Sequence, residues 1–268
     1  MDADRYLARI GLDPSAVETA DRETLSDLVA AHATTVPFET LATADDPHGE
    51  RAGRGVSLAP ADCFEKVVER RRGGFCYELN GLFGWLLDDL GYEPTRVASM
   101  MLGDDGDPSP PADHLTHVVD LDRRYVVDVG MGVPRPRGPV PLDGTARTDP
   151  TGVDWRVRPS DRPDCDYLVQ YREGDDWTDR FVFADRHRPR SFFAATCEYL
   201  ATAPESPFTG EPVVAVSTSD GYRKLNPETL VTVADADRTE REVAPDEWHD
   251  VLAREFGVAL GRRGPNRT

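Results

Sequence analysis

The sequence predicts an α+β chain in which helices come first and strands follow. Up to about residue 90, apolar residues recur at helical spacing in several segments. From Thr95 onward the pattern changes to short runs of β-branched and aromatic residues, separated by Gly, Pro and Asp. The last segment mixes both patterns, and no internal repeat is apparent. A chain of 268 residues is long enough for two or three subdomains with sizeable cores.

Helical segments are predicted in order along the first part of the chain. The apolar stripe of "ETLSDLVAAHATT" ends at Pro37, which leads into an extended "PFETL". "APADCFEKVVERRRGG" begins a second helix with Pro60 near its first turn and closes it at Gly73. A third helix begins at Cys76 and stops at Gly91.

Two polar loops and a series of strands complete the prediction. The loops are "ADDPHGERAGRG" (44–55) and "GDDGDPSPPAD" (103–113). Strand runs to about residue 187 suit a small antiparallel barrel or sheet: "TRVASMML", "HLTHVVDLD", "RRYVVDVGMG", "DWRVRP", "DYLVQYRE" and "RFVFAD". The last part contains a helix near 191–202, the strands "PVVAVST", "YRKLN" and "LVTVAD", and a closing helix "PDEWHDVLAREFG".

The composition restricts the partners and the compartment. The chain carries 31 basic and 49 acidic residues, a net charge of −18, and its only lysines are Lys66 and Lys224. Nucleic acid is not expected as a partner, because its phosphates would be repelled. We expect a cytoplasmic protein from a cell interior rich in salt, where screening relieves the self-repulsion. No run of 18 apolar residues and no basic, apolar leader is visible, so we expect neither a membrane span nor secretion.

The cysteines point to one candidate nucleophile. The chain has four, Cys63, Cys76, Cys165 and Cys197, and their spacing matches no metal site or disulfide framework. Only Cys76, in "RRGGFCYELNGLFGWLL", lies at the predicted start of a helix behind a double glycine. Free backbone N–H groups and the positive end of the helix dipole stabilise a thiolate at such a position.

A cysteine nucleophile needs a base, and a third group that orients the base. Among six histidines, only His114 and His117 lie on a predicted strand beside another polar strand residue, Asp128. A carboxylate in the apolar run "YVVDVG" needs a partner, and an imidazolium across the hairpin would serve. Structural roles also fit the spacing: a strand cap for His114, a solvated position for His117 and a turn contact for Asp128.

Taken together, these residues resemble the arylamine N-acetyltransferases. The stretches "RRGGFCYELNGLF", "HLTHVVDLDRRYVVDVGMG", "VPFETL" and "YLATAPESPF" are similar to segments of that family across most of the chain. The resemblance implies a Cys-His-Asp triad in a cysteine-protease-like arrangement. It also implies a helical bundle (1–92), a central antiparallel β-barrel (93–190) and a C-terminal α/β lid (191–268). Met131 stands where the family has Phe, and Cys197 stands where we expect an Asn.

The choice of histidine depends on the hairpin turn. A two-residue turn at Asp122 and Arg123 would place His117 opposite Asp128 and His114 on the other face. Such tight turns favour Gly or Asn, and "LDRRY" contains neither. A three-residue turn restores His114 to the face of Asp128. We therefore choose His114 as the base and keep His117 as the alternative.

Several neighbours of the motifs are candidates for lesser roles. Arg72 and Glu78 flank the nucleophile and are expected to form an ion pair or a turn contact, and Asn80 is expected to support the loop. The residues that we expect to bind the acceptor or the cofactor are Phe38, Phe75, Gly130, Met131 and Gly132. No metal is required.

The resemblance implies the reaction. Acetyl-CoA would acylate Cys76, CoA would leave, and an arylamine, hydrazine or arylhydroxylamine would then attack the thioester, giving ping-pong kinetics. A cysteine hydrolase or a transglutaminase-like enzyme with the same triad is the alternative function, and acylation by acetyl-CoA but not by peptides or glutamine amides separates them. A non-catalytic binding module is a third reading, and it predicts an unreactive Cys76. The sequence leaves the oligomeric state open.

Overall fold

The computed structural model describes residues 1–17, 19–49, 55–103, 105–235 and 237–260. Part of each predicted polar loop, residues 50–54 and residue 104, lies outside the described residues. Within the described ranges, none of the helices combines the length and the hydrophobicity that a bilayer crossing requires.

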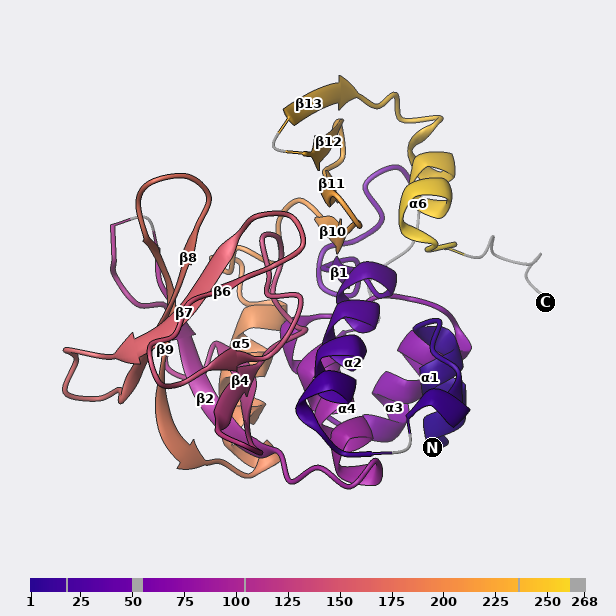
Figure 1. The fold of residues 1–268 in the computed structure, drawn as a ribbon. Helices are drawn as coiled ribbons and strands as arrows, with labels where there is room; N and C mark the ends of the chain where they lie inside the picture. The colour runs from indigo at the N-terminus through magenta and orange to yellow at the C-terminus, as the bar shows by residue number, and fades with distance from the viewer. Residues whose placement is uncertain (18, 50–54, 104, 236, 261–268) are drawn as a thin grey trace.

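The helices follow the predicted order, with one boundary that differs. The α-helices are α1 (Ala3–Arg9), α2 (Arg22–Thr35), α3 (Pro60–Phe64), α4 (Cys76–Asp89), α5 (Ala194–Thr202) and α6 (Trp248–Phe256) (Figure 1). Short 3-10 helices cover Pro14–Ala16 and Arg190–Phe193, and a π-helical turn, Glu65–Glu69, continues α3.

The second predicted helix ends at Glu69 and not at Gly73. Arg71 adopts a left-handed conformation with φ 50°, which ends helical continuation. The chain beyond it pairs with the segment after α2, because Gly74 N–H donates to the Pro37 carbonyl (3.2 Å) and Glu39 N–H donates to the Gly74 carbonyl (2.9 Å). Tertiary pairing has therefore overridden a helical sequence pattern.

The strands between residues 95 and 187 form one eight-stranded antiparallel sheet that curls into a nearly closed barrel (Figure 1). Its strand order is β5-β4-β3-β2-β9-β8-β7-β6. The strands are β2 (Thr95–Met101), β3 (His114–Asp120), β4 (Arg124–Val127), β5 (Val140–Pro141), β6 (Arg147–Thr148), β7 (Asp154–Pro159), β8 (Tyr167–Arg172) and β9 (Thr178–His187). The barrel that the resemblance implied is confirmed.

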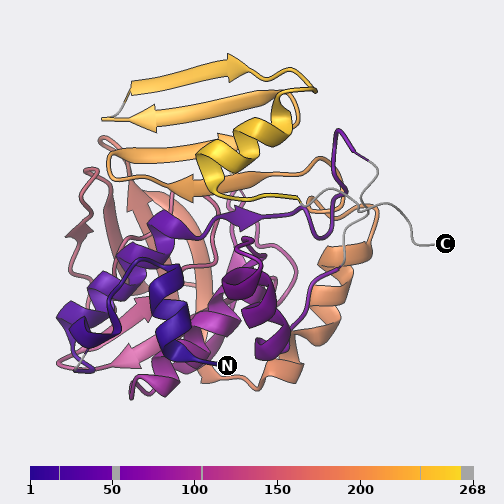
Figure 2. The same cartoon turned by 90° about the vertical axis from the view of Figure 1, so that its right-hand side faces the viewer.

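A second sheet of five strands forms the lid, in the order β1-β10-β11-β12-β13. The strands are β1 (Phe38–Glu39), β10 (Val214–Ser217), β11 (Gly221–Leu225), β12 (Thr229–Ala234) and β13 (Asp237–Glu242). In Figure 2 this sheet lies above the helices, with α6 packed on one of its faces. β1 comes from the N-terminal part of the chain and pairs with β10 across some 175 residues, Phe38 opposite Ala215.

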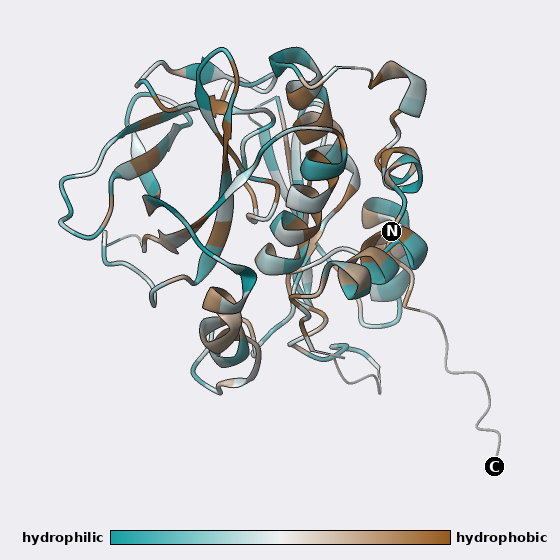
Figure 3. Cartoon of the chain, turned by 90° about the horizontal axis from the view of Figure 1, so that it is seen from below, coloured by the Kyte–Doolittle hydropathy of each residue, from teal (hydrophilic) through white to brown (hydrophobic). Residues whose placement is uncertain are grey.

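The main apolar cores correspond to the three parts of the architecture. One lies between the helices and β3, a second lies inside the barrel, and a third lies between the lid sheet and α6. Figure 3 shows hydrophobic and hydrophilic residues alternating along the helices and strands. Phe193, Cys197 and Leu200, at α5, belong to the first core, so the 191–268 segment is shared between the lid and the helices. The residue boundaries of the three domains stay a prediction.

Candidate active site

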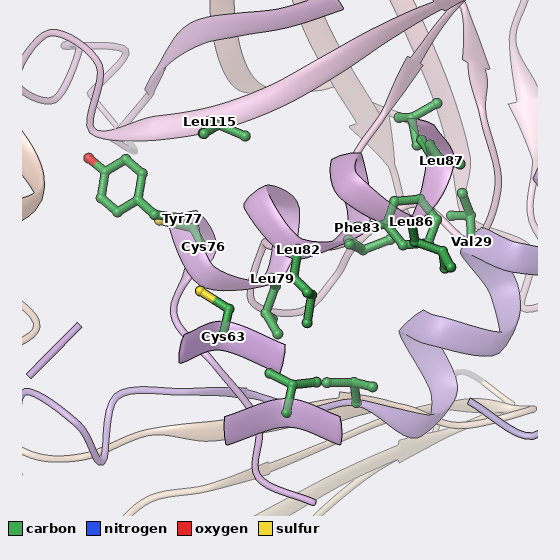
Figure 4. Close-up of a cluster of buried hydrophobic side chains, with 14 of the residues drawn as sticks. Val29, Cys63, Cys76, Tyr77, Leu79, Leu82, Phe83, Leu86, Leu87 and Leu115 are labelled. Carbon is green, nitrogen blue, oxygen red and sulfur yellow. The ribbon is translucent and has the colours of Figure 1, made fainter. Parts of the chain in front are cut away.

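Cys76 is the first residue of α4, and the turn before it is built from its own neighbours. The Glu78 carboxylate accepts a hydrogen bond from the Phe75 N–H (2.9 Å) and forms an ion pair with Lys66 Nζ (2.6 Å). A Cβ at Gly73 would lie 2.2 Å from the Pro37 carbonyl oxygen, so only glycine fits there. Figure 4 shows Cys76 at one end of the helix, whose leucines extend away into the core.

Arg72 also holds this turn, but through a partner that lies far away in the sequence. Its Nε and Nη2 donate to the two carboxylate oxygens of Glu39, at 2.9 and 2.6 Å. Glu39 is fully buried, and a bidentate pair is the geometry that compensates a buried carboxylate best. Arg72 and Glu78 therefore do not pair with each other, and Arg72 is held by Glu39 of the "PFETL" stretch.

The hairpin turn decides which histidine meets Asp128. Asp120 pairs with Arg124, so three residues form the turn, as predicted. His114 Nε2 lies 2.5 Å from Asp128 Oδ2, and both side chains are almost fully buried. His114 also packs against the ring of Phe181 inside the barrel, with ring centroids 5.6 Å apart.

His117 faces the opposite way, toward helix α4. A Cβ at Gly84 would lie 2.3 Å from His117 Nε2, so glycine at this position of α4 makes room for the ring. Neither ring nitrogen has a hydrogen-bond partner among the described residues, and burial lowers the pKa of His117 to about 3. His117 is therefore a neutral packing residue of the core between β3 and α4.

Asn80, one turn into α4, ties the nucleophile's helix to the histidine and the aspartate. Its Nδ2 donates to the Leu115 carbonyl (2.6 Å) and to Asp128 Oδ1 (3.0 Å). Its Oδ1 accepts from the N–H of Val129 (2.9 Å). Gly130 N–H donates to the same Asp128 oxygen (2.9 Å), so Asp128 accepts hydrogen bonds on both of its oxygens. The predicted supporting role of Asn80 thus extends to the carboxylate itself.

The pKa values of Asp128 and Cys76 depend on the charged groups beside them. Burial alone would raise the pKa of Asp128, but the charge and hydrogen bond of His114, with the bonds from Asn80 and Gly130, lower it overall. Burial raises the pKa of the Cys76 thiol well above its ordinary value, and the carboxylates of Asp113 and Asp128 raise it further. The helix N-terminus alone is therefore not enough, and a thiolate on Cys76 requires a cation beside it.

Two contacts of the loop before β3 were missed by sequence reasoning. The Cys76 thiol donates to the backbone carbonyl of Asp113 at 3.7 Å, and the Tyr77 hydroxyl donates to the carbonyl of Ala112 at 2.6 Å. The Asp113 carboxylate accepts from the Met101 N–H (3.0 Å), and burial raises the pKa of Asp113 to about 6. An acidic residue directly before the candidate base was the available signal, but it lay at the end of a stretch that reads as a polar loop.

The predicted binding residues fall into different environments. Phe38 and the fully buried Phe75 form an aromatic cluster with half-buried Phe208, whose ring lies 4.8 Å from that of Phe75. Phe208 belongs to the quoted "YLATAPESPF" stretch but was not among the predicted site residues. Met131 lies in the core of the barrel, and a Cβ at Gly132 would meet open space.

The other cysteines lie in settings that do not favour reaction. Burial raises the pKa of Cys63 and of Cys197 to about 12, and it also raises the pKa of Cys165. In the part of the chain that the structure describes, no cluster of His, Cys, Asp and Glu side chains is suited to hold a metal ion. The arrangement around Cys76 can therefore perform nucleophilic chemistry, with an acid-base group held by a buried carboxylate.

Comparison with known proteins gives consistent results. Residues 21–264 match the family model described as N-acetyltransferase. An arylamine N-acetyltransferase of Mycolicibacterium smegmatis is 32% identical over 97% of this chain and 93% of its own length.

Solved structures agree with these matches. The chain superposes on a Bacillus cereus arylamine N-acetyltransferase, described with a Cys-His-Glu catalytic triad, with a TM-score of 0.85 at 25% identity, covering 97% of this chain and all of that one. The Mycobacterium marinum arylamine N-acetyltransferase in complex with CoA gives a TM-score of 0.81 at 28% identity, covering 96% of this chain and 93% of that one.

Proposed function

Because the chain belongs to the arylamine N-acetyltransferase family and is an acyltransferase, we propose that it carries the acetyl group of acetyl-CoA as a thioester on Cys76. The acceptors that we propose are arylamines, hydrazines and arylhydroxylamines. The observation that carries the proposal is the hydrogen-bonded unit of Asn80, His114 and Asp128, which is joined directly to the helix that begins at Cys76. A cysteine hydrolase, a transglutaminase-like enzyme and a binding module are set aside, because the matching family model and relatives are N-acetyltransferases.

His114 supplies the cation that Cys76 requires. Its Nε2 is bound to Asp128, so Nδ1 is the ring nitrogen that exchanges protons with the thiol and the substrates. Transfer of the Cys76 proton to Nδ1 gives a thiolate and an imidazolium together. The lowered pKa of Asp128 keeps the carboxylate charged beside that imidazolium.

The first half-reaction acylates the enzyme. The Cys76 thiolate attacks the acetyl carbonyl, and the bond from the carbonyl carbon to the CoA sulfur breaks. His114 gives its Nδ1 proton to the departing CoA thiolate. The backbone N–H of Cys76, in the first turn of α4, stabilises the oxyanion in this proposal, and loss of one such donor costs about 3 kcal/mol in other enzymes.

The second half-reaction releases the product. The amine nitrogen attacks the thioester, His114 takes the amine proton on Nδ1, and the bond from the carbonyl carbon to Cys76 Sγ breaks. The products are the N-acetylated acceptor and the original enzyme. The protein thus stores the acetyl group covalently, so donor and acceptor need not be bound at the same time.

The two substrates are proposed to approach from positions that the site leaves open. The Mycobacterium marinum structure with CoA supports acetyl-CoA as the donor. Gly132, with open space around its missing Cβ, allows such a ligand to approach, whereas a Cβ at Gly130 would lie 2.5 Å from Asn80 Nδ2. Half-buried Phe208, with Phe38 behind it, supplies the aromatic surface for the acceptor, and buried Phe75 supports these rings.

The experiment that tests this function is a steady-state assay with acetyl-CoA and a panel of arylamines and hydrazines. Parallel double-reciprocal lines are expected, because the acceptor attacks only after CoA has left. Intersecting lines would indicate a ternary complex and direct transfer, and would contradict the thioester route.

A cytoplasm rich in salt is a separate proposal, supported by the net charge of −18. Screening should relieve repulsion among the carboxylates, so the melting temperature should rise between dilute buffer and molar KCl. Equal melting temperatures in the two media would contradict it.

A further inference from the structure

A cleft of about 310 Å³ opens on the molecule outside the proposed active site. It is lined by Arg9 of α1, by the end of α2, by Arg71, and by parts of β10, β11 and α6. In Figure 2 the lid sheet lies over the indigo helices α1 and α2. Residues of these helices and of the lid line the cleft together. None of its lining residues belongs to the proposed acyl-transfer machinery.

Positive charge gathers in this cleft although the chain as a whole is strongly acidic. Three arginines line it, and Glu255 is the only carboxylate among its lining residues. Glu255 is already engaged, by Arg223 at 3.2 Å and by Arg254 at 2.9 Å. The guanidiniums of Arg9 and Arg71 are therefore left without a counter-charge in the cleft.

Arg9 is fixed in place and repelled by its neighbour. Its Nε donates to the Val67 carbonyl (3.0 Å) and its Nη1 donates to the Thr35 carbonyl (3.2 Å), so the buried side chain cannot turn away. Burial, and after it the positive charge of Arg71, lower the pKa of Arg9 to about 10. An anion between the two guanidiniums would remove that repulsion.

The backbone and the side chain of Arg71 also indicate a ligand site. It has φ 50°, a conformation that glycine adopts at lower cost, yet the chain places an arginine there. Arg71 makes no hydrogen bond or ion pair with any residue that the structure describes, whereas its neighbours Arg70 and Arg72 each have a carboxylate partner. The free guanidinium beside a cleft is available to a ligand.

We propose that this cleft binds a phosphate group, carried by inorganic phosphate or by a small phosphomonoester. A phosphate dianion matches the two positive charges left by three arginines and one glutamate. Guanidinium forks donate in pairs to the oxygens of such groups, and hydroxyl side chains of the cleft, including Ser217 and Ser219, offer further donors. The cleft is larger than the anion itself, which leaves room for an organic group on a phosphomonoester.

The test measures phosphate binding to the intact protein. Inorganic phosphate and glycerol phosphate are titrated in KCl at constant ionic strength, and the melting temperature and the phosphorus-31 linewidth are followed. A saturable rise in melting temperature and a broadened phosphorus signal are expected. Tighter binding of glycerol phosphate identifies a phosphomonoester site, and equal binding identifies a site for the phosphate group alone.

Two variants with the same change in net charge make the test specific. Arg71→Gln should weaken phosphate binding by about tenfold or more, since a charge-assisted hydrogen bond is lost. Arg70→Gln should leave binding unchanged, because Arg70 lies outside the cleft and pairs with Glu65. If Arg71→Gln does not fold, Arg223→Gln takes its place. Glu255 then loses its partner in the cleft, so phosphate binding should again weaken.

A stabilisation no greater than that given by chloride at equal ionic strength would overturn the proposal. So would an equal response of the Arg71 and Arg70 variants. Cys76 acetylation by acetyl-CoA should be the same in Arg71→Gln and in the unaltered protein, so failure here is distinguishable from failure of the proposed function.

Discussion

Replacing Asp128 by asparagine should stop acetyl transfer by changing the proton on His114, with little change in shape. Asp128 Oδ1 accepts from both Asn80 Nδ2 and Gly130 N–H, so the amide oxygen of asparagine must take that position. The amide NH₂ then points at His114 Nε2, which lies 2.5 Å from the other oxygen in the native protein. A donor there forces Nε2 to accept, so the ring proton moves to Nδ1, the nitrogen that has to receive the thiol proton.

The size of the effect follows from two losses. A hydrogen bond to a charged group is worth about 1.5–3 kcal/mol, which corresponds to about 10- to 150-fold in rate. The wrong tautomer adds to this, and the same substitution in a serine protease triad costs about 10⁴-fold. Acylation of Asp128→Asn by acetyl-CoA should therefore be slower by about 10²- to 10⁴-fold.

The assay is single-turnover acylation followed by rapid quenching and intact-mass measurement. Circular dichroism in high salt checks that the fold is retained. Asn80→Ala is the matched comparison, because it removes one donor to Asp128 but leaves the His114 contact possible, and it should lose less activity. Acylation of Asp128→Asn within about fivefold of the native rate would refute the tautomer argument.

Other substitutions test neighbouring parts of the site. His114→Gln should make iodoacetamide alkylation of Cys76 slow at pH 6, while His117→Gln should leave that rate within about threefold, because His117 packs against α4. The reverse ranking of the two rates would overturn the choice of base. Asp113→Asn should raise the free energy of unfolding at pH 7.5 by up to about 3 kcal/mol, since burial raises the folded pKa of Asp113 to about 6, above an unfolded value near ~3.9. Between pH ~3.9 and about 6 the Asp113 carboxyl binds more protons in the folded than in the unfolded protein. The stability gain of Asp113→Asn should therefore shrink as the pH falls from about 6 toward ~4. Urea unfolding of the two proteins that shows no such pH dependence would contradict this reasoning. Gly130→Ala should destabilise the fold by about 1–3 kcal/mol and slow acylation, because its Cβ would lie 2.7 Å from the Cys76 carbonyl oxygen; native stability would show that the site relaxes easily.

Local patterns predicted the parts of the fold that local forces determine. The apolar spacing of α2 and α4 and the breaker Pro37 depend on neighbouring residues only, and these helices are where the periodicity placed them. The hairpin is similar, because the chemistry of the turn is enough to choose three residues over two. A three-residue turn by itself places His114 on the face of Asp128.

The elements that sequence reasoning missed depend on distant partners. β13 is an exposed edge strand of charged residues, whose only strand signal is its pairing with β12. The early end of the second helix results from pairing between Gly74 and the Pro37–Glu39 segment. The burial of Glu39 depends on its ion pair with Arg72. The cleft between α1, Arg71 and the lid likewise joins segments that are far apart in the chain.

The central claim is that the acetyl group passes through Cys76. The most direct test mixes the protein with acetyl-CoA in high salt and without acceptor, and then measures the intact mass and maps the adduct by peptide digestion. The account predicts one added acetyl group on Cys76, absent in Cys76→Ala and discharged when an arylamine is added. No adduct, or an adduct that persists on Cys63 or Cys197 in the Cys76→Ala variant, would contradict it.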